Sequence, residues 1–426
     1  MHQRKLFYCS ILCLIVLSLL LAACGPFGGN ATTTPTPTKV PNAGTTSTGT
    51  TIDQLTQAVL QNMHLHSWNT LAMSKNVVTG GLYINWKMND PSVTNAVRPG
   101  PDGNPQHNHD PQVDLFYLTS LVEYHQLHPQ DQSFASDLAR MTTVVVSEYP
   151  SYSVPKGWIY FYLLNDGLLL QNSDLVNEAY TAANNFYRTW YDKKLGVVYD
   201  IKHTPGDYGV DHSMMAGAAL IDAGKRWNVP AWVTAGKSTI DTILAVALDP
   251  KYHMFYDSMV VNADGHETVQ NYQAKPSTQG QTVDALVIAY TLTHKTNYLN
   301  VAREVLQNLY SSGLWDSKNG GFFFALDMKS GKLLTDYKET RSQTLVLLAL
   351  QHFNQVKPQF TQQEQQLTSV IANHFYQSTY HGFFYRVTPT FQVYYSRPGT
   401  GIGVEDYFTT EAMGSALDAL QTTELK

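Results

Sequence analysis

Carboxylates near the start of apolar segments are the residues of this sequence best suited to chemistry. Asp114 and Asp211 each stand near the beginning of such a segment, and Asp166 lies inside a third. A pair of acids can transfer protons, one as acid and one as base, when their surroundings separate their pKa values. A buried carboxylate is costly unless it is paired, so Asp166 is either a hydrogen-bonded core residue or an acid with a raised pKa. We predict Asp114, Asp211 and Asp166 as catalytic residues.

Helix capping is the alternative role for the same acids, because a carboxylate is favoured in the first turn of a helix. Asp211 is followed by His212, an imidazole that could tune the acid or hold a ligand. Glu405 and Asp406 follow a glycine-containing loop that could close over a ligand, or they simply begin a helix. Including loop aromatics, which could instead pack between helices, the predicted ligand-binding residues are Trp86, Trp158, Tyr160, His212, Tyr256, Phe323, Arg341, Tyr385, Glu405 and Asp406.

Several other kinds of chemistry have no motif in this chain. It has no phosphate loop, no zinc-protease helix, no calcium loop and no nucleophile elbow. The three cysteines, Cys9, Cys13 and Cys24, all precede residue 25, which leaves no thiol chemistry or disulfide for the remainder. The segment His107–Asp110 has only short-range spacing, so we predict no metal and no cofactor. With a net charge of −6 and no basic stripe, nucleic acid is not an expected partner.

The elements that must position these residues are helices of two alternating kinds. About twelve helical segments follow Ile52, with few convincing long strands. Residues 296–312 carry one apolar face opposite a polar one, the pattern of a helix with one face in water. Residues 281–292 are apolar nearly all round, which is typical of a buried helix. The chain therefore alternates outer and inner helices.

The connections between these helices repeat as well. Residues 191–200, 248–257, 315–324 and 376–385 share a polar turn, usually a glycine, and then aromatic or β-branched residues. Each follows an outer helix and leads through a longer loop to an inner one. A period of roughly 60 residues, each a helix-loop-helix unit, indicates a repeat architecture. Six helical hairpins fit the length.

Six such hairpins resemble the six-hairpin glycosidase superfamily, whose fold is the (α/α)6 toroid. The resemblance implies one all-α domain over residues 52–426, with a glycan-binding cleft on the face that carries the long loops. An open α-solenoid of binding repeats is the alternative, against which the long aromatic loops count. The inner helices are predicted to begin near Gln112, Gly157, Asp211, Gln279, Glu339 and Asp406.

The segment from His109 to Leu118 resembles the start of a catalytic inner helix. It is similar to the Asp-Asp-x-x-Trp segment of bacterial α-1,6-mannanases and to the His-Asp-x-Gly-Phe segment of unsaturated glucuronyl hydrolases. It lacks the adjacent aspartates of the first and the glycine of the second, so neither substrate carries over.

The superfamily resemblance implies a glycoside hydrolase that acts on a poly- or oligosaccharide through paired carboxylates, with aromatic side chains stacking on sugar rings. A polysaccharide lyase with a Tyr or His base and an arginine against a uronate stays open. So does a non-catalytic glycan-binding lipoprotein.

The N-terminus has the pattern of an export signal. Basic residues at 2–5 precede an apolar run, Leu6–Ala23, which ends in Leu21-Ala22-Ala23-Cys24-Gly25. This resembles a bacterial lipoprotein leader, which implies cleavage before Cys24 and acylation of that cysteine. An uncleaved membrane anchor is the alternative. We therefore predict a signal peptide over 1–23 and a disordered Thr/Pro/Gly tether over 24–51. The mature chain is expected to be a monomer, lipid-anchored to the cell membrane on its extracytoplasmic side.

Overall fold

The computed structural model describes residues 51–69, 81–92, 94, 110–149, 154–203, 205–394 and 407–424 of one compact unit that spans residues 43–426. The predicted leader, tether and Cys24 lie outside these residues, as do Glu405 and Asp406. Within the described ranges the secondary structure consists of twelve α-helices, α2 to α13, with short strands between them. None of these helices combines the length and apolar character needed to cross a membrane.

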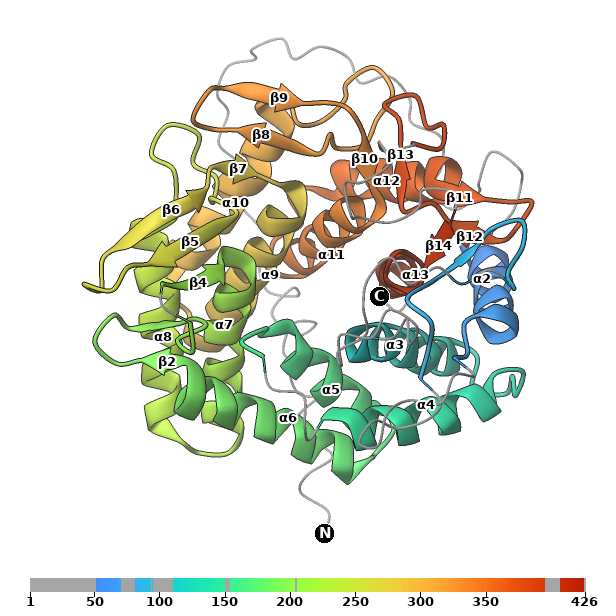
Figure 1. Ribbon diagram of the computed structural model, residues 1–426, viewed down its shortest axis with the longest axis horizontal. Helices are drawn as coiled ribbons and strands as arrows, with labels where there is room; N and C mark the ends of the chain where they lie inside the picture. The colour runs from blue at the N-terminus through green and yellow to red at the C-terminus, as the bar shows by residue number, and fades with distance from the viewer. Residues whose placement is uncertain are drawn as a thin grey trace, which may run out of the picture. The chain divides into compact units, whose positions relative to one another are not determined.

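Six inner helices form a closed ring (Figure 1). Each packs against the next one along the chain, and the last packs against the first, which excludes the open solenoid. Most of their residues are buried, as the sequence predicts for helices that are apolar on nearly every side. They are α3 (Pro111–Leu127), α5 (Trp158–Leu169), α7 (Val210–Arg226), α9 (Pro276–Thr293), α11 (Thr340–Val356) and α13 (Thr410–Glu424).

Six outer helices surround the ring, each packed on one inner helix. Five follow their inner partner along the chain, but α2 packs on α13, so the two ends of the described chain close the ring. The predicted amphipathic segment is α10, whose apolar face is buried. The outer helices are α2 (Ile52–His66), α4 (Ala135–Glu148), α6 (Ser173–Asn185), α8 (Pro230–Val246), α10 (Thr296–Ser311) and α12 (Thr361–Val370). Single π-helical segments, Phe186–Trp190 and Ile371–Phe375, extend α6 and α12.

The repeated turns of the sequence are hairpins that follow the outer helices. β2 (Tyr191–Asp192) pairs with β3 (Val197–Val198), and β11 (Tyr376–Gln377) pairs with β12 (Gly382–Phe383). Single bridges close the same turn after α8 and α10. Each turn has at least one residue with a left-handed backbone, which is why glycine recurs there. These residues are Gly196, His253, Gly320 and His381.

A second set of antiparallel strands joins neighbouring loops. β1 (Asn85–Lys87) pairs with β14 (Tyr407–Thr409), and β10 (Lys338–Glu339) pairs with β13 (Arg386–Val387). Two three-stranded sheets contain β4 (Gly206–Gly209), β5 (Ser258–Val261) and β6 (Glu267–Asn271), then β7 (Gln273–Ala274), β8 (Ala325–Asp327) and β9 (Lys332–Leu334).

Four of these strands, β4, β7, β10 and β14, run directly into inner helices. The pairing therefore gathers the N-terminal ends of the inner helices on one face of the ring, which we call the loop face. The last inner helix begins at Thr410 rather than near Asp406, because residues 407–409 are drawn into β14.

Glycines allow the inner helices to approach one another closely. A Cβ atom on Gly157 would lie 1.9 Å from the backbone nitrogen of Ala216 in α7, and one on Gly280 would lie 2.6 Å from the backbone of Leu345 in α11. Such contacts leave no room for any side chain. Glycine at these two positions thus sets the spacing of the ring.

Candidate active site

Polar side chains from four inner helices share one helical position at the loop face. Gln112, Asp211, Arg341 and Glu411 are each the second residue of their helix, in α3, α7, α11 and α13. Lys156 stands two residues before α5. The Arg341 guanidinium is 3.2 Å from a carboxylate oxygen of Glu411, and the Lys156 ammonium donates to the Gln112 side-chain oxygen at 2.8 Å. We call these five residues the axial cluster.

The axial cluster spans the ring rather than one side of it. Burial lowers the pKa of Arg341, but the charges of Glu411, Asp211 and Glu339 outweigh burial and raise it. Burial lowers the pKa of Lys156, and the nearby Arg341 charge adds to this effect. Helix α9 separates α7 from α11, and α5 lies across the ring from α11, so interacting side chains from these helices must meet near the axis.

His212 adds a proton acceptor to this cluster. A carboxylate oxygen of Asp211 accepts the backbone N–H of His212 at 2.8 Å. Burial lowers the pKa of His212; Lys156 and Arg341 lower it further, while Asp211 opposes them. The imidazole is therefore neutral at pH 7 and able to accept a proton.

Aromatic residues and a second ion pair lie beside the cluster. Glu339, which immediately precedes α11, accepts from the Arg386 guanidinium at 3.1 Å. That guanidinium also lies 4.4 Å from the ring centre of Tyr337 and 4.8 Å from that of Tyr385. Tyr337 in turn packs against Tyr394, with ring centres 4.9 Å apart. The loop face thus combines charged groups with aromatic rings around the ends of α11 and α13.

Side chains at the fourth position of the inner helices bind the backbone of loops, unlike those at the second position. Asp114 is fully buried, and one of its carboxylate oxygens accepts the backbone N–H of Leu82 at 2.7 Å. Gln343, at the same position of α11, accepts from the Phe322 N–H at 2.7 Å and donates to its carbonyl at 3.0 Å. Gln279 in α9 and Ser213 in α7 bind the backbone of the preceding hairpin in the same manner. The geometry favours a structural role for Asp114, as a clamp on its loop.

Asp166 lies away from the axial cluster. It is the ninth residue of α5, so it is about 12 Å along the helix from the first. The carboxylate is buried and accepts the Thr119 hydroxyl at 2.9 Å. Burial, with a smaller contribution from the Asp418 charge, raises its pKa well above the usual range. Asp166 is therefore a hydrogen-bonded core residue whose pKa is raised by burial, and its catalytic role stays a prediction.

Three of the predicted sugar-stacking aromatics are core residues. Trp86 packs edge-on against Phe408, and Trp158 stacks on Phe116 with ring centres 5.1 Å apart. The Tyr160 hydroxyl donates to Asp222 at 2.5 Å. All three are buried, so in this structure they offer no ring face to a ligand at the loop face. Packing between helices, the alternative role given to them, describes the contacts of Trp158 and Tyr160, whereas Trp86 packs between strands β1 and β14.

The remaining ligand-binding candidates lie on the loops. The Tyr256 hydroxyl donates to Asp249 at 2.8 Å, and burial raises the pKa of Tyr256 to about 12. Phe323 is partly exposed beneath the Lys338 ammonium, 5.4 Å from its ring centre. Tyr385 is buried beside Arg386. Of the predicted site residues, the structure brings Asp211, His212, Arg341 and Tyr385 together.

Three cluster residues, Gln112, Lys156 and Glu411, were not predicted as site residues from the sequence. A usable signal exists for Glu411, because it is the second residue of its helix, as Asp211 and Arg341 are of theirs. That register is visible only when the helix start is known, and the prediction placed this start at Asp406. Lys156 precedes its helix, so the register does not reveal it.

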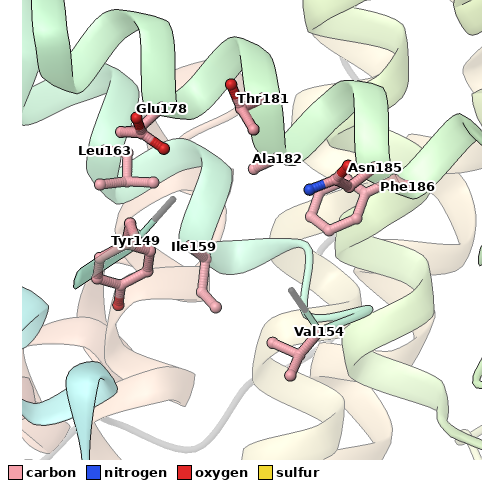
Figure 2. Close-up of a pocket in the computed structure, with 9 residues that line it drawn as sticks. All are labelled: Tyr149, Val154, Ile159, Leu163, Glu178, Thr181, Ala182, Asn185 and Phe186. Atoms are coloured by element: carbon pink, nitrogen blue, oxygen red, sulfur yellow. The ribbon is translucent and has the colours of Figure 1, made fainter. Parts of the chain in front are cut away.

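The cavity in Figure 2 lies between α5 and α6 and is no substrate site. Its volume is about 10 Å³, room for about one water molecule. Glu178 lines it, and burial, helped by the Asp174 charge, raises the pKa of Glu178. Among the described residues, no group of three or more His, Cys, Asp or Glu side chains could hold a metal ion.

Solved structures of the same fold include several carbohydrate enzymes. The chain is similar to an unsaturated glucuronyl hydrolase specific for heparin, with 14% identity, a TM-score of 0.62, and coverage of 88% of this chain and 97% of that one. It is also similar to a D-mannose isomerase, with 12% identity, a TM-score of 0.61, and coverage of 87% of this chain and 97% of that one. A third similar structure is the α-1,6-mannanase GH76A of Salegentibacter sp. HEL1_6 in complex with α-1,6-mannotetrose. Its identity is 9% and its TM-score is 0.62, with coverage of 88% of this chain and 99% of that one.

These likenesses confirm the fold predicted from the sequence, the (α/α)6 toroid of the six-hairpin glycosidases. At identities this low they establish the fold alone. The sequence matches no protein-family profile and no curated protein.

Proposed function

We propose that this chain is a glycoside hydrolase acting on a poly- or oligosaccharide, with the axial cluster as its reaction centre. The observation that carries the proposal is the placement of Asp211 and Glu411. They hold the same position in α7 and α13, helices on opposite sides of the ring, and both act on Arg341. Hydrolysis of a glycosidic bond needs two carboxyl groups that flank it. Two acids on opposite inner helices that both act on one guanidinium are the pair best placed to flank such a bond.

The surroundings of the two acids suit different roles. Glu411 is paired with the Arg341 guanidinium, so it suits the base or nucleophile, which must be ionised. Asp211 is only 9% exposed, and within the described ranges no cationic side chain forms an ion pair with it. We assign the remaining role, that of the second carboxyl group, to Asp211. Fold relatives named for mannan and glucuronyl substrates support a glycan as the partner.

The test replaces each acid by its amide, as Asp211→Asn and Glu411→Gln, after a screen of neutral and uronic oligosaccharides for one that is cleaved. Each change removes proton transfer at nearly constant size, so we expect a loss of rate of about a hundredfold to ten-thousandfold. Glu304→Gln, on the outer helix α10, is the matched control and should keep full activity. Variants with native circular dichroism and more than half of the wild-type rate would remove both acids from the mechanism.

A polysaccharide lyase is the second candidate, and His212 is the observation that favours it. A neutral imidazole beside a guanidinium fits proton abstraction from a uronate whose carboxylate Arg341 neutralises. Such a reaction leaves an unsaturated product that absorbs in the ultraviolet. An absorbing product that His212→Gln no longer forms would select the lyase. The rate of the lyase reaction would also fall as the pH drops through the lowered pKa of His212, because the protonated imidazole cannot act as a base.

We also propose that the enzyme is a monomeric lipoprotein, held through Cys24 on the extracytoplasmic side of the cell membrane. The Leu-Ala-Ala-Cys-Gly sequence at the end of the apolar leader supports this. More than one acyl chain is needed for a stable attachment. Labelled palmitate should enter the wild type and not Cys24→Ser. Equal labelling of the two would refute the anchor.

A further inference from the structure

A large cavity lies beside the outer helix α2, where that helix meets the β11–β12 hairpin. Its walls come from α2, residues 86–91, the start of α4 and the tip of the β11–β12 hairpin. The volume is about 770 Å³, within the range of small-molecule sites. We call it the seam pocket. Its lining includes Gln57, Gln61, Asn62, Trp86, Asn89 and Tyr380.

The lining of the seam pocket combines apolar side chains with uncharged polar ones. Five carboxamide side chains and the hydroxyls of Ser133 and Thr379 border it, and none of its lining residues is Asp, Glu, Lys or Arg. The two histidines are His66, whose pKa burial lowers, and His381, whose ring nitrogen lies 2.9 Å from the Tyr376 hydroxyl. A carboxamide can both donate and accept, and so can a hydroxyl group. The lining therefore suits an uncharged ligand rich in hydroxyls, unlike the charged axial cluster.

An exposed aromatic ring borders the same pocket. Tyr380, at the hairpin tip, is 40% exposed, and Leu65 on α2 is 61% exposed. They are two of only seven large apolar side chains exposed in the described part of the chain. The Asn62 side chain donates to the Tyr380 carbonyl at 2.5 Å, which fixes the hairpin on α2. A fixed and open aromatic face suits the apolar C–H face of a pyranose ring.

Two buried polar atoms of lining residues have no hydrogen-bond partner within the described ranges. One is the side-chain oxygen of Asn62, a residue only 8% exposed, and the other is the indole N–H of fully buried Trp86. Buried donors and acceptors are almost always satisfied by protein or by water. Both atoms are themselves buried, so they mark polar groups in the pocket wall that protein contacts leave unsatisfied.

We propose that the seam pocket binds a neutral oligosaccharide, as a site separate from the axial cluster. Tyr380 supplies the stacking face, and Gln57, Gln61 and Asn89 supply hydrogen bonds to sugar hydroxyls. The pocket shares no lining residue with the axial cluster, so a glycan can bind there without being cleaved. A glycan chain held at this place would stay attached to the protein while another part of it is processed.

Calorimetric titration of the full-length protein tests the site. The Asp211→Asn variant is titrated with mannotetraose, cellotetraose and maltotetraose, and with tetragalacturonate as the charged comparison. In this background Tyr380→Ala and Gln61→Ala should each weaken binding of at least one neutral tetrasaccharide tenfold or more. Tyr180→Ala is the matched control. Tyr180 is also 40% exposed, but it lies on α6, a helix that contributes no residue to the pocket. It should leave the affinity unchanged.

Three results would overturn the proposal. One is that no neutral tetrasaccharide binds, or that one binds equally well to both variants and the parent. Another is equal binding of tetragalacturonate at the same residues. The third is binding that appears only after residues 1–50 are deleted, which would make the chain's own N-terminal segment the occupant. All are binding measurements, so an inactive axial cluster would leave them valid.

Discussion

Two residues of separation on a helix decide which acid can reach a substrate. The second and fourth residues of an inner helix point about 200° apart. Position two carries Asp211, Arg341 and Glu411 to the axis, while position four turns Asp114 and Gln343 back onto the loops. An aspartate occurs at both positions, and the register separates the acid suited to chemistry, Asp211, from the acid that holds a loop, Asp114.

Asp114→Ala should therefore damage stability rather than catalysis. It removes the acceptor for the buried Leu82 N–H, which costs about 1–3 kcal/mol of the free energy of unfolding. Urea unfolding measures this loss, and kcat of the folded variant should stay within about threefold of wild type. Asp114→Asn keeps an acceptor oxygen and should lose less stability. A well-folded Asp114→Asn protein that has lost a hundredfold in rate would restore Asp114 as the catalytic acid.

At the scale of the elements, three inner helices bring acids together in the core. Glu123 of α3, Asp166 of α5 and Asp418 of α13 are buried near one another. Burial is the main cause of a raised pKa for each, and for Glu123 the Asp418 charge adds to it. Tyr162 of α5 donates its hydroxyl to Asp418 at 2.5 Å. The hydrogen bond ties α5 to α13 and favours ionised Asp418, but burial outweighs it and favours the protonated acid.

The pH dependence of stability follows from the sign of these shifts. A folded-state pKa above the unfolded value, about 4 for Asp and Glu, stabilises the fold fully only below that unfolded value. The stabilisation is lost as the pH rises through the raised pKa. The free energy of unfolding should thus fall from pH 5 to pH 8. Asp166→Asn keeps the bond from Thr119 and cannot ionise, so it should exceed wild type by at least about 1 kcal/mol at pH 8.

Urea unfolding at pH 5 and pH 8 compares the two proteins directly. Glu364→Gln on α12, outside this acid group, serves as the control and should keep the wild-type slope with pH. Identical slopes for wild type and Asp166→Asn would show that Asp166 does not titrate between these pH values.

At the scale of the whole molecule, ring closure makes stability cooperative. Helix α13 packs on α11 and α3 within the ring and on α2 outside it. No helix pair is therefore terminal in space, although α2 and α13 are terminal among the described elements. In an open solenoid the last repeat contacts one neighbour only, so the other repeats stay folded when it is removed. In this ring the same loss exposes the buried faces of three helices.

Truncation before Gln359, which removes α12 and α13, should therefore unfold the remainder. Circular dichroism and a thermal melt measure the outcome, with loss of helicity beyond the two deleted helices as the expected result. Removal of residues 1–50, which the sequence predicts to be leader and tether, serves as the control and should leave the melting transition unchanged. A truncated protein with a sharp transition and native helicity would mean that the hairpins fold independently.

The sequence alone determined the class of the fold, because the alternation of amphipathic and all-apolar helices depends only on local periodicity. The recurrent turns had the same local origin, since residues such as Gly196 and Gly320 adopt a backbone that glycine favours. Asp211, His212 and Arg341 could be named because they stand near predicted helix starts. The tertiary structure decided which side chains meet. The partnership of Arg341 with Glu411, the clamp by Asp114 and the burial of Trp158 all depend on helix register and ring closure. These are long-range geometric relations, and local periodicity carries no information about them.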